Sequence, residues 1–215
     1  MAPRIGWFGG CPMTPRSRKP QGKFLSTDQI NETTRLIVDR WKVGGRIALI
    51  GGAALNFYGS DRFTKDVDFI ANNTIPADDA DDLRRISGLS FGGSRYMAPD
   101  QVPVDVIVRD DHGAALYEEA LDCAEPTDEG FLIVTPEYLA AMKYEAMRGK
   151  DEIDLLWMLA QKGLVNAKKA EAIIREHCGG QRAAKEFRML AKEATWREEE
   201  GEFDDQGEPD DGSEE

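Results

Sequence analysis

Apolar residues in the first half of the chain follow two periods, one typical of helices and one typical of strands. They recur every three to four positions over residues 27–41, and Ser26 and Gln29 have the spacing of a capping box at the start of this stretch. Short apolar runs bounded by glycine, proline or polar residues predict buried strands. These runs are residues 46–50, 66–71, 102–108 and 131–134.

Between these strands the pattern predicts short helices, and after them it becomes helical throughout. Residues 89–97 form either a strand or a hairpin. Pro136 suits the first turn of a helix, and residues 136–197 keep a helical period. The sequence therefore predicts an α+β fold, with a small mixed β-sheet flanked by helices and a helical C-terminal half. The predicted short helices are residues 53–58, 77–86 and 114–121.

The charge of the chain is concentrated at its two ends. The net charge is −13 over 215 residues, yet residues 1–24 carry only basic charges, and residues 198–215 carry eleven acidic side chains and no basic one. Both ends are poor in apolar residues, so we expect disordered tails there. The tails flank an α/β core over residues 25–134 and a helical subdomain over residues 135–197. Because these two parts together are only mildly acidic, charge gives no argument for a nucleic-acid partner.

The sequence carries no signal for a membrane or for export. The longest apolar run, residues 47–55, is much shorter than the ~20 residues that span a bilayer. The first residues lack the apolar segment and the small-residue cleavage site of a secretory signal. Three cysteines without Cys-x-x-Cys spacing exclude a disulfide framework and a structural zinc site. We therefore expect a cytoplasmic protein without a membrane partner.

Three aspartates interrupt the predicted strands. In Asp66-Val67-Asp68-Phe69 the strand period sends both carboxylates to one face, with Cα atoms roughly 6.5–7 Å apart. Asp105 stands inside an otherwise apolar strand, where a lone charge is costly unless it is paired. Such oxygen ligands suit Mg²⁺, and three of them can hold two ions for in-line attack on phosphorus. The alternative is an edge strand with two solvated aspartates and a third at the rim of the sheet.

A pair of glycines, Gly51 and Gly52, lies where a predicted strand ends and a short helix begins. Glycines at such a point permit close approach of the backbone and leave N–H groups facing an anion. A plain tight turn explains the pair equally well. The surrounding sequence is not a P-loop, because no Gly-Lys-Ser/Thr follows, and not a dinucleotide fingerprint, because the third glycine is absent.

The order of these features resembles the nucleotidyltransferase superfamily that includes DNA polymerase β. Within that superfamily the chain is most similar to the minimal and AbiEii-like abortive-infection toxin nucleotidyltransferases. Many relatives carry serine after the first glycine, where this chain has Gly52. The motifs that carry the resemblance are, in chain order, Gly51-Gly52, Gly59, Arg62-x-Thr64 and Asp66-x-Asp68.

The resemblance implies a role for each motif. The three carboxylates hold two divalent ions, Mg²⁺ or its substitute Mn²⁺, and take part in catalysis. The residues assigned to this role are Asp66, Asp68 and Asp105. The glycine pair approaches the triphosphate of a nucleotide. Arg62 and Lys65 either steady phosphates beside the metal site or are solvated turn residues. The residues of this half assigned to nucleotide binding are Gly51, Gly52, Arg62, Thr64 and Lys65.

Residues 139–155 resemble the second block of the family, in which a helical lysine reaches the nucleotide phosphates. By this resemblance Lys143 binds phosphate and is catalytic. Asp151 and Asp154 belong to the same nucleotide site, where they orient Lys143 or assist removal of a proton. If one helix runs through Gly149, Lys143 and Asp154 share a face. The alternative is an exposed helix junction crossed by salt bridges.

The predicted function is transfer of a nucleoside monophosphate from a nucleoside triphosphate to an acceptor hydroxyl, with loss of pyrophosphate. The subtype implies a toxin-like component of a toxin–antitoxin or phage-defence system. Its acceptor is then tRNA or protein, and a cognate antitoxin is its partner. Two alternatives stay open: transfer to a small molecule such as an aminoglycoside, and a non-catalytic member of the family that binds a partner protein.

Overall fold

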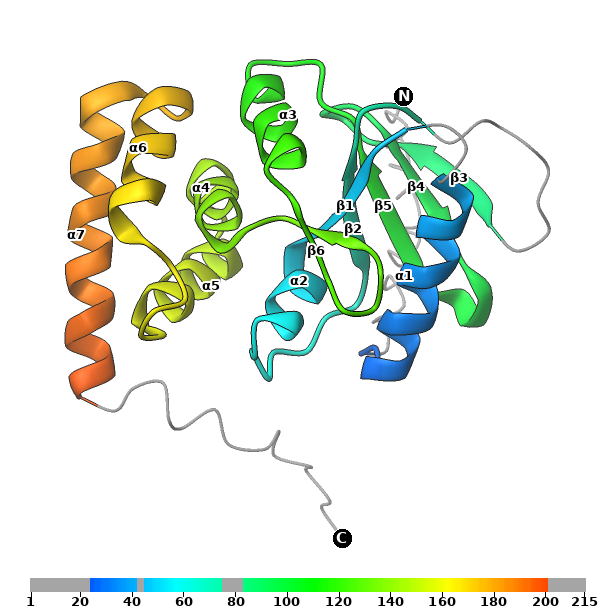
Figure 1. Ribbon diagram of the computed structural model, residues 1–215, viewed down its shortest axis with the longest axis horizontal. Helices are drawn as coiled ribbons and strands as arrows, with labels where there is room; N and C mark the ends of the chain where they lie inside the picture. The colour runs from blue at the N-terminus through cyan, green and yellow to red at the C-terminus, as the bar shows by residue number, and fades with distance from the viewer. Residues whose placement is uncertain (1–23, 42–44, 75–82, 201–215) are drawn as a thin grey trace, which may run out of the picture.

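The computed structural model describes residues 24–41, 45–74 and 83–200. Within them a seven-stranded mixed sheet is surrounded by helices, which gives the expected α+β fold (Figure 1). The strands are β1 (Ile47–Ile50), β2 (Val67–Ala71), β3 (Arg84–Gly88), β4 (Ser94–Met97), β5 (Pro103–Ile107), β6 (Glu125–Pro126) and β7 (Leu132–Ile133). The helices are α1 (Thr27–Trp41), α2 (Gly51–Phe57), α3 (Ala114–Asp122), α4 (Pro136–Ala146), α5 (Gly149–Ala160), α6 (Ala167–His177) and α7 (Gly180–Glu199), with a short 3₁₀ helix at Pro99–Gln101.

The sheet has the order β3-β4-β5-β2-β1-β7-β6, which puts the most apolar strands at its centre. β2 lies between β5, to which it is parallel, and β1, to which it is antiparallel. Val67 and Phe69 are fully buried on one face of β2, as the alternation of the sequence predicts. The edge-strand alternative for this segment is therefore wrong, because β2 has a hydrogen-bonded neighbour on each side.

The helix α1 begins at the predicted capping box. The Ser26 N–H donates to Gln29 Oε1 over 3.1 Å, and the Gln29 N–H donates to Ser26 Oγ over 3.3 Å. Its apolar stripe, which includes Ile37 and Trp41, is buried against the sheet, where α1 contacts β1 and β2.

The helical half begins at α4, directly after Thr135, where the sequence predicts the change of architecture. In Figure 1 helices α4 to α7 stand together at one end of the molecule, and the sheet with α1 lies at the other. One hydrophobic cluster runs from Ile30 to Phe187 through both halves, so their division into two domains stays a proposal. Among the described residues, no helix has the length and apolar character needed to cross a membrane.

The predicted helix over residues 77–86 and the predicted C-terminal tail differ from the structure. Residues 84–86 of the predicted helix 77–86 belong to strand β3, and residues 77–82 lie outside the described residues. All five residues of β3 are exposed at the edge of the sheet, so no apolar alternation marks the strand in the sequence. Residues 198–199 extend helix α7, and the rest of both predicted tails, apart from residues 24 and 200, lies outside the described residues.

The condition that one helix runs through Gly149 is not met. Helix α4 ends at Ala146, Met147 adopts a left-handed conformation with φ of 39°, and α5 begins at Gly149. Lys143 and the two downstream aspartates therefore lie on different helices. Their contact comes from the packing of α5 against α4, and not from a shared helix face.

Candidate active site

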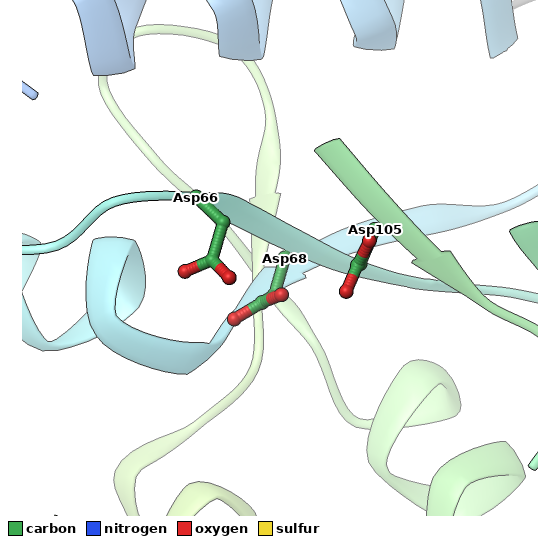
Figure 2. A group of neighbouring side chains, drawn as sticks. All are labelled: Asp66, Asp68 and Asp105. Carbon is green, nitrogen blue, oxygen red and sulfur yellow. The ribbon is translucent and has the colours of Figure 1, made fainter. Parts of the chain in front are cut away.

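The three aspartates converge because two neighbouring strands are in register. In the parallel pair of β2 and β5, Asp68 lies directly opposite Asp105, and Asp66 comes just before β2 on the same face. One carboxylate oxygen from each residue lies within 4.8 Å of the others. Figure 2 shows the three side chains grouped on one side of the two strands. The sequence predicted this meeting on the condition that the two strands are neighbours, and they are.

This arrangement places like charges close together in a poorly hydrated position. Burial, together with the neighbouring carboxylates Asp66 and Asp105, raises the pKa of Asp68 from 3.8 to about 7. All three donors are hard carboxylate oxygens, which are the ligands that Mg²⁺ and Mn²⁺ prefer. The donor set therefore fits a divalent ion, which would relieve the repulsion among the three groups.

One side chain already supplies positive charge to this group. Arg95 on β4 donates from Nε to Asp105 Oδ1 and from Nη2 to Asp105 Oδ2, both over 2.6 Å, and its Nη2 lies 3.9 Å from Asp66 Oδ2. The hydrogen bond to Asp105 is the first cause of a raised pKa for the Arg95 guanidinium. We refer to Asp66, Asp68 and Asp105 as the acidic triad.

The glycine pair makes room for side chains of the site. Gly51 opens α2 with φ of +71°, and a Cβ there would lie 2.2 Å from Asp68 Oδ2. A Cβ on Gly52 would lie 2.8 Å from Thr64 Oγ1, and that hydroxyl donates to the main-chain oxygen of Asp66 over 3.0 Å. The two glycines thus form the first turn of the helix and do not precede it. Their small size lets α2 press against Asp68 and Thr64.

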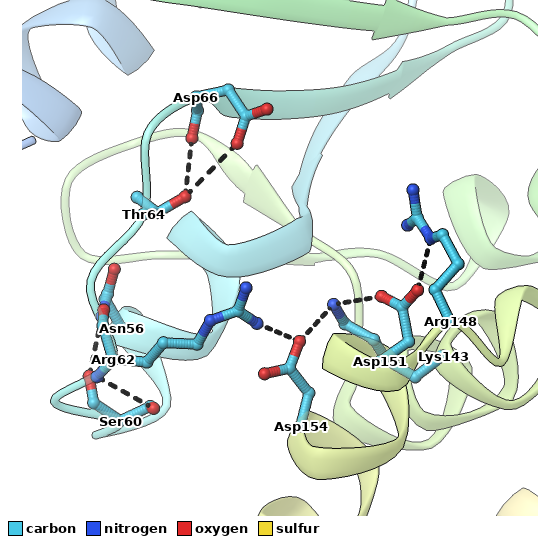
Figure 3. Close-up of polar contacts among 9 residues, drawn as sticks. All are labelled: Asn56, Ser60, Arg62, Thr64, Asp66, Lys143, Arg148, Asp151 and Asp154. Carbon is cyan, nitrogen blue, oxygen red and sulfur yellow. Dashed lines mark hydrogen bonds and ion pairs between the residues drawn. The ribbon is translucent and has the colours of Figure 1, made fainter. Parts of the chain in front are cut away.

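A second charged group faces the acidic triad from the helical half. The Lys143 ammonium of α4 donates to Asp151 Oδ1 over 3.0 Å and to Asp154 Oδ2 over 2.6 Å, and all three side chains are buried (Figure 3). Arg62 pairs with Asp154 from the loop before β2, and Arg148 donates to Asp151 Oδ2 over 2.6 Å. We refer to these five residues as the lysine network. The predicted alternative of an exposed helix junction is wrong, because Asp151 and Asp154 are almost fully buried.

The lysine network holds its own charges in place. Burial alone would raise the pKa of Asp151, yet hydrogen bonds from Arg148 and Lys143 bring that pKa below its usual value. The loop that carries Arg62 is fixed by Asn56, whose amide donates to the main-chain oxygens of Ser60 and Arg62, both over 2.7 Å (Figure 3). The loop that positions the Arg62 guanidinium at the cavity is therefore held by helix α2, which begins with the glycine pair.

The acidic triad and the lysine network line the same cavity, which has a volume of about 740 Å³. Two of the predicted site residues are not in its wall. Asp154 is buried in contact with Lys143 and Arg62, and the Lys65 ammonium lies 4.8 Å from the centre of the Phe24 ring. The predicted residues that line the cavity are Gly51, Gly52, Arg62, Thr64, Asp66, Asp68, Asp105, Lys143 and Asp151.

Three arginines of the cavity were missed by sequence reasoning. Arg95 lies on β4, in the segment that the sequence predicts as a strand or a hairpin, and Arg148 lies in the turn between α4 and α5. Arg109 follows β5 and packs 4.7 Å from the centre of the Tyr117 ring, where it pairs with Glu145 over 3.1 Å. The one signal in the sequence is its spacing: Arg109 stands two residues after Ile107, the last residue of the strand that carries Asp105. The alternation of a strand would direct residues 105, 107 and 109 to the same face.

A mixed sheet that brings three carboxylates to the wall of a cavity with basic side chains opposite is typical of nucleotidyl-transfer enzymes. Residues 40–214 match the protein family described as "Nucleotidyl transferase AbiEii toxin, Type IV TA system". The match covers most of the chain, so the chain belongs to the AbiEii nucleotidyltransferase family. This confirms the resemblance drawn from the glycine pair and the Asp-x-Asp motif, and with it the class of enzyme.

Comparison with solved structures finds a similarity to the antibiotic-resistance factor ANT(2'')-Ia, known from a solution structure with substrate-regulated conformation dynamics. The identity is 12%, the match covers 84% of this chain and 100% of that chain, and the TM-score is 0.36. A similarity at this level says nothing about the substrate of the present chain. No curated protein matches the sequence.

Proposed function

We propose that this nucleotidyltransferase transfers a nucleoside monophosphate from a nucleoside triphosphate to an acceptor hydroxyl in a Mg²⁺-dependent reaction. One observation carries the proposal: the acidic triad, whose donor oxygens lie within 4.8 Å of one another, shares a cavity with the buried lysine network. A triphosphate bound between the two groups would meet cations on one side and metal ligands on the other.

On the sheet side, the acidic triad is the proposed metal site. Asp66 and Asp68 would hold the divalent ions. Asp105 would bind the catalytic ion and help to take the proton from the acceptor hydroxyl. The bound ions supply charge neutralisation for the phosphates and lower the pKa of the attacking hydroxyl. The role of Gly51 in this proposal is to let Asp68 reach its position beside the helix start.

On the helical side, Lys143 and Arg62 are the proposed phosphate ligands. Both already lie at the cavity, and each is held there by a buried carboxylate. A cation that is fixed before the substrate arrives loses little conformational freedom on binding, so it can favour the transition state directly. Arg148 and Lys150 add positive charge at the same wall. Asp151 and Asp154 act as positioning residues in this scheme.

The proposed biological role follows from the family, whose description names a toxin of a type IV toxin–antitoxin system. We therefore expect a cognate antitoxin as a partner and tRNA or protein as the acceptor. The acceptor rests on the family resemblance alone.

The experiment that tests the proposal is incubation with each α-³²P-labelled nucleoside triphosphate, Mg²⁺, total cell RNA and total cell protein. We expect label in RNA or protein with the wild-type chain, and none with the Asp66→Asn/Asp68→Asn variant or after chelation of the metal. Label that moves only into an added aminoglycoside would contradict the macromolecular acceptor. The absence of transfer to any acceptor would contradict the proposed reaction and favour a partner-binding role.

A further inference from the structure

Arg95 continues the row of residues that forms the acidic triad. Asp68 lies opposite Asp105 in the pairing of β2 with β5, and Arg95 lies opposite Asp105 in the pairing of β4 with β5. Residues that are directly opposite on neighbouring strands point to the same face of the sheet. Three adjacent strands therefore place an arginine beside the proposed metal ligands, at the wall of the same cavity.

The contact between Arg95 and Asp105 occupies both oxygens of the carboxylate. Each oxygen accepts one N–H over 2.6 Å in a two-pronged pair, which is the strongest common form of a side-chain ion pair. Asp105 is largely buried, whereas the Arg95 side chain is 41% exposed and lies at the open side of the pair. Arg95 thus takes one acceptor position on each Asp105 oxygen, and its positive charge opposes the approach of a cation to that carboxylate.

Asp66 and Asp68 are in a different position. The nearest Arg95 nitrogen lies 3.9 Å from Asp66 Oδ2, which is beyond hydrogen-bond distance, and Asp68 makes no ion pair with Arg95. A divalent ion can therefore approach Asp66 and Asp68 without displacing the arginine. The structure thus divides the acidic triad into two ligands that are accessible to a cation and one that is guarded.

We propose that Arg95 is a positioning residue that sets the order of ion binding, so that the site takes one divalent ion through Asp66 and Asp68 and takes the second, through Asp105, only with a nucleotide. The proposal rests on the proposed function, because it assumes that the acidic triad binds metal. Two divalent ions beside three carboxylates and an arginine leave a surplus of positive charge. A triphosphate removes that surplus and offers the arginine a new anionic partner.

The test is a count of Mn²⁺ ions bound to the full-length protein, measured by electron paramagnetic resonance of free Mn²⁺ during a titration. We expect one tightly bound ion in the wild type without nucleotide, and two with a non-hydrolysable nucleoside triphosphate analogue. In Arg95→Gln we expect the second ion to bind without nucleotide, at least about tenfold more tightly than in the wild type, because a like charge has been removed.

Arg85→Gln is the matched control. Arg85 lies on the adjacent strand β3 and donates to Ser94 Oγ over 3.0 Å, outside the cavity, so its loss removes the same charge without touching Asp105. This variant should keep the wild-type count. Circular dichroism reports whether each variant folds. If Arg95→Gln does not fold, the wild-type counts still test the proposed order, because two ions bound without nucleotide would overturn it.

Two results would overturn the proposal and leave the proposed function intact. One is a wild type that binds two ions without nucleotide, and the other is a folded Arg95→Gln variant that still binds one. A wild type that binds no Mn²⁺ in either condition, with the same result for Asp68→Asn, would contradict the metal site itself. It would therefore contradict the proposed function as well.

Discussion

The acidic triad and the lysine network lie on opposite sides of one cavity, and they treat buried charge differently. In the triad three carboxylates face one another, and Arg95 is the cation bound to one of them. In the lysine network the signs alternate, so that Arg62, Asp154, Lys143, Asp151 and Arg148 each contact a group of opposite charge. The lysine network is electrostatically satisfied without a ligand, whereas the triad is not.

This difference separates two tasks that an enzyme site performs. A group whose charges are already balanced by the protein can hold a fixed geometry before a substrate binds. A group of like charges has high affinity for a cation, because ion binding relieves a repulsion that is present in the free protein. We therefore expect substitutions in the triad to affect metal binding and catalysis, and substitutions in the lysine network to affect stability as well.

The largest effect on activity is expected for Asp68→Asn. Loss of this charge removes a ligand at the centre of the triad, so nucleotidyl transfer should fall by at least about 10²- to 10³-fold. The metal-free protein should be as stable as the wild type or more so, because a like charge has gone. Labelled-nucleotide transfer and thermal melting with and without Mg²⁺ measure the two effects. Asp61→Asn is the control and should keep activity, because Asp61 is exposed and lies outside the cavity wall. If Asp68→Asn lost stability but kept nucleotidyl transfer, the triad would be a structural group and not the catalytic one.

Lys143→Met should show the opposite balance. Removal of the ammonium leaves two buried carboxylates with one cation each, and breaking a buried ion pair of this kind costs about 3–5 kcal/mol of unfolding free energy. Lys169→Met is the matched control, because Lys169 is half-exposed and its pair with Glu137 is worth less than about 1 kcal/mol. Urea denaturation measures both. Equal losses in the two variants would show that the lysine network is not a buried, balanced group.

The two groups should also differ in their response to pH when metal is removed. The pKa of Asp68 is raised from 3.8 to about 7, so between these values the folded protein holds a proton that the unfolded chain has lost. The unfolding free energy should therefore fall as pH rises through this window, by at most about 1.4 kcal/mol per pH unit. The pKa of Asp151 is lowered, so its contribution runs in the other direction and is lost only in more acidic solution.

Denaturation in a chelator at pH 5 and pH 8 tests this dependence. Asp68→Asn should flatten the fall in stability between the two pH values, and Mg²⁺ should reduce it in the wild type. A wild-type protein whose stability rises over the same interval would contradict the raised pKa of Asp68.

A smaller effect is expected at the contact between α2 and the triad. Gly51→Ala adds a Cβ that would lie 2.2 Å from Asp68 Oδ2, in addition to the left-handed strain of about 1–2 kcal/mol. Gly59→Ala has a similar positive φ of +91° with open space around the added Cβ, so it carries the strain alone. We expect both variants to lose stability and only Gly51→Ala to lose transfer. Equal activity in the two would mean that Gly51 does not shape the site.

Two of the motifs from which the sequence predicted the site are marked by residues that do not suit their surroundings. Asp105 is a charge in an apolar strand, and Gly51-Gly52 is a pair of flexible residues at a strand end. The parallel pairing of β2 with β5 then turns these local signals into one group. Lys143 had no such signal, and the family resemblance alone identified it.

The parts that the sequence missed depend on tertiary contacts. Arg95 acts through its register with Asp105, which no local pattern of an exposed hairpin can specify. The left-handed residue that separates α4 from α5 is Met147, neither a proline nor a glycine, so the helical period alone does not mark the break. Lys65, adjacent in sequence to Asp66, is drawn instead to the ring of Phe24. A position next to Asp66 in the sequence therefore does not place the Lys65 side chain at the acidic triad.

The central claim is that the acidic triad is the metal centre at which the nucleotide reacts. Crystals of the protein grown with Mn²⁺ and a non-hydrolysable nucleoside triphosphate analogue test it directly through the anomalous scattering of manganese. The account predicts an anomalous peak between Asp66, Asp68 and Asp105, with the phosphates of the analogue extending toward Lys143 and Arg62. A nucleotide bound elsewhere, or a triad without manganese beside a bound nucleotide, would contradict it.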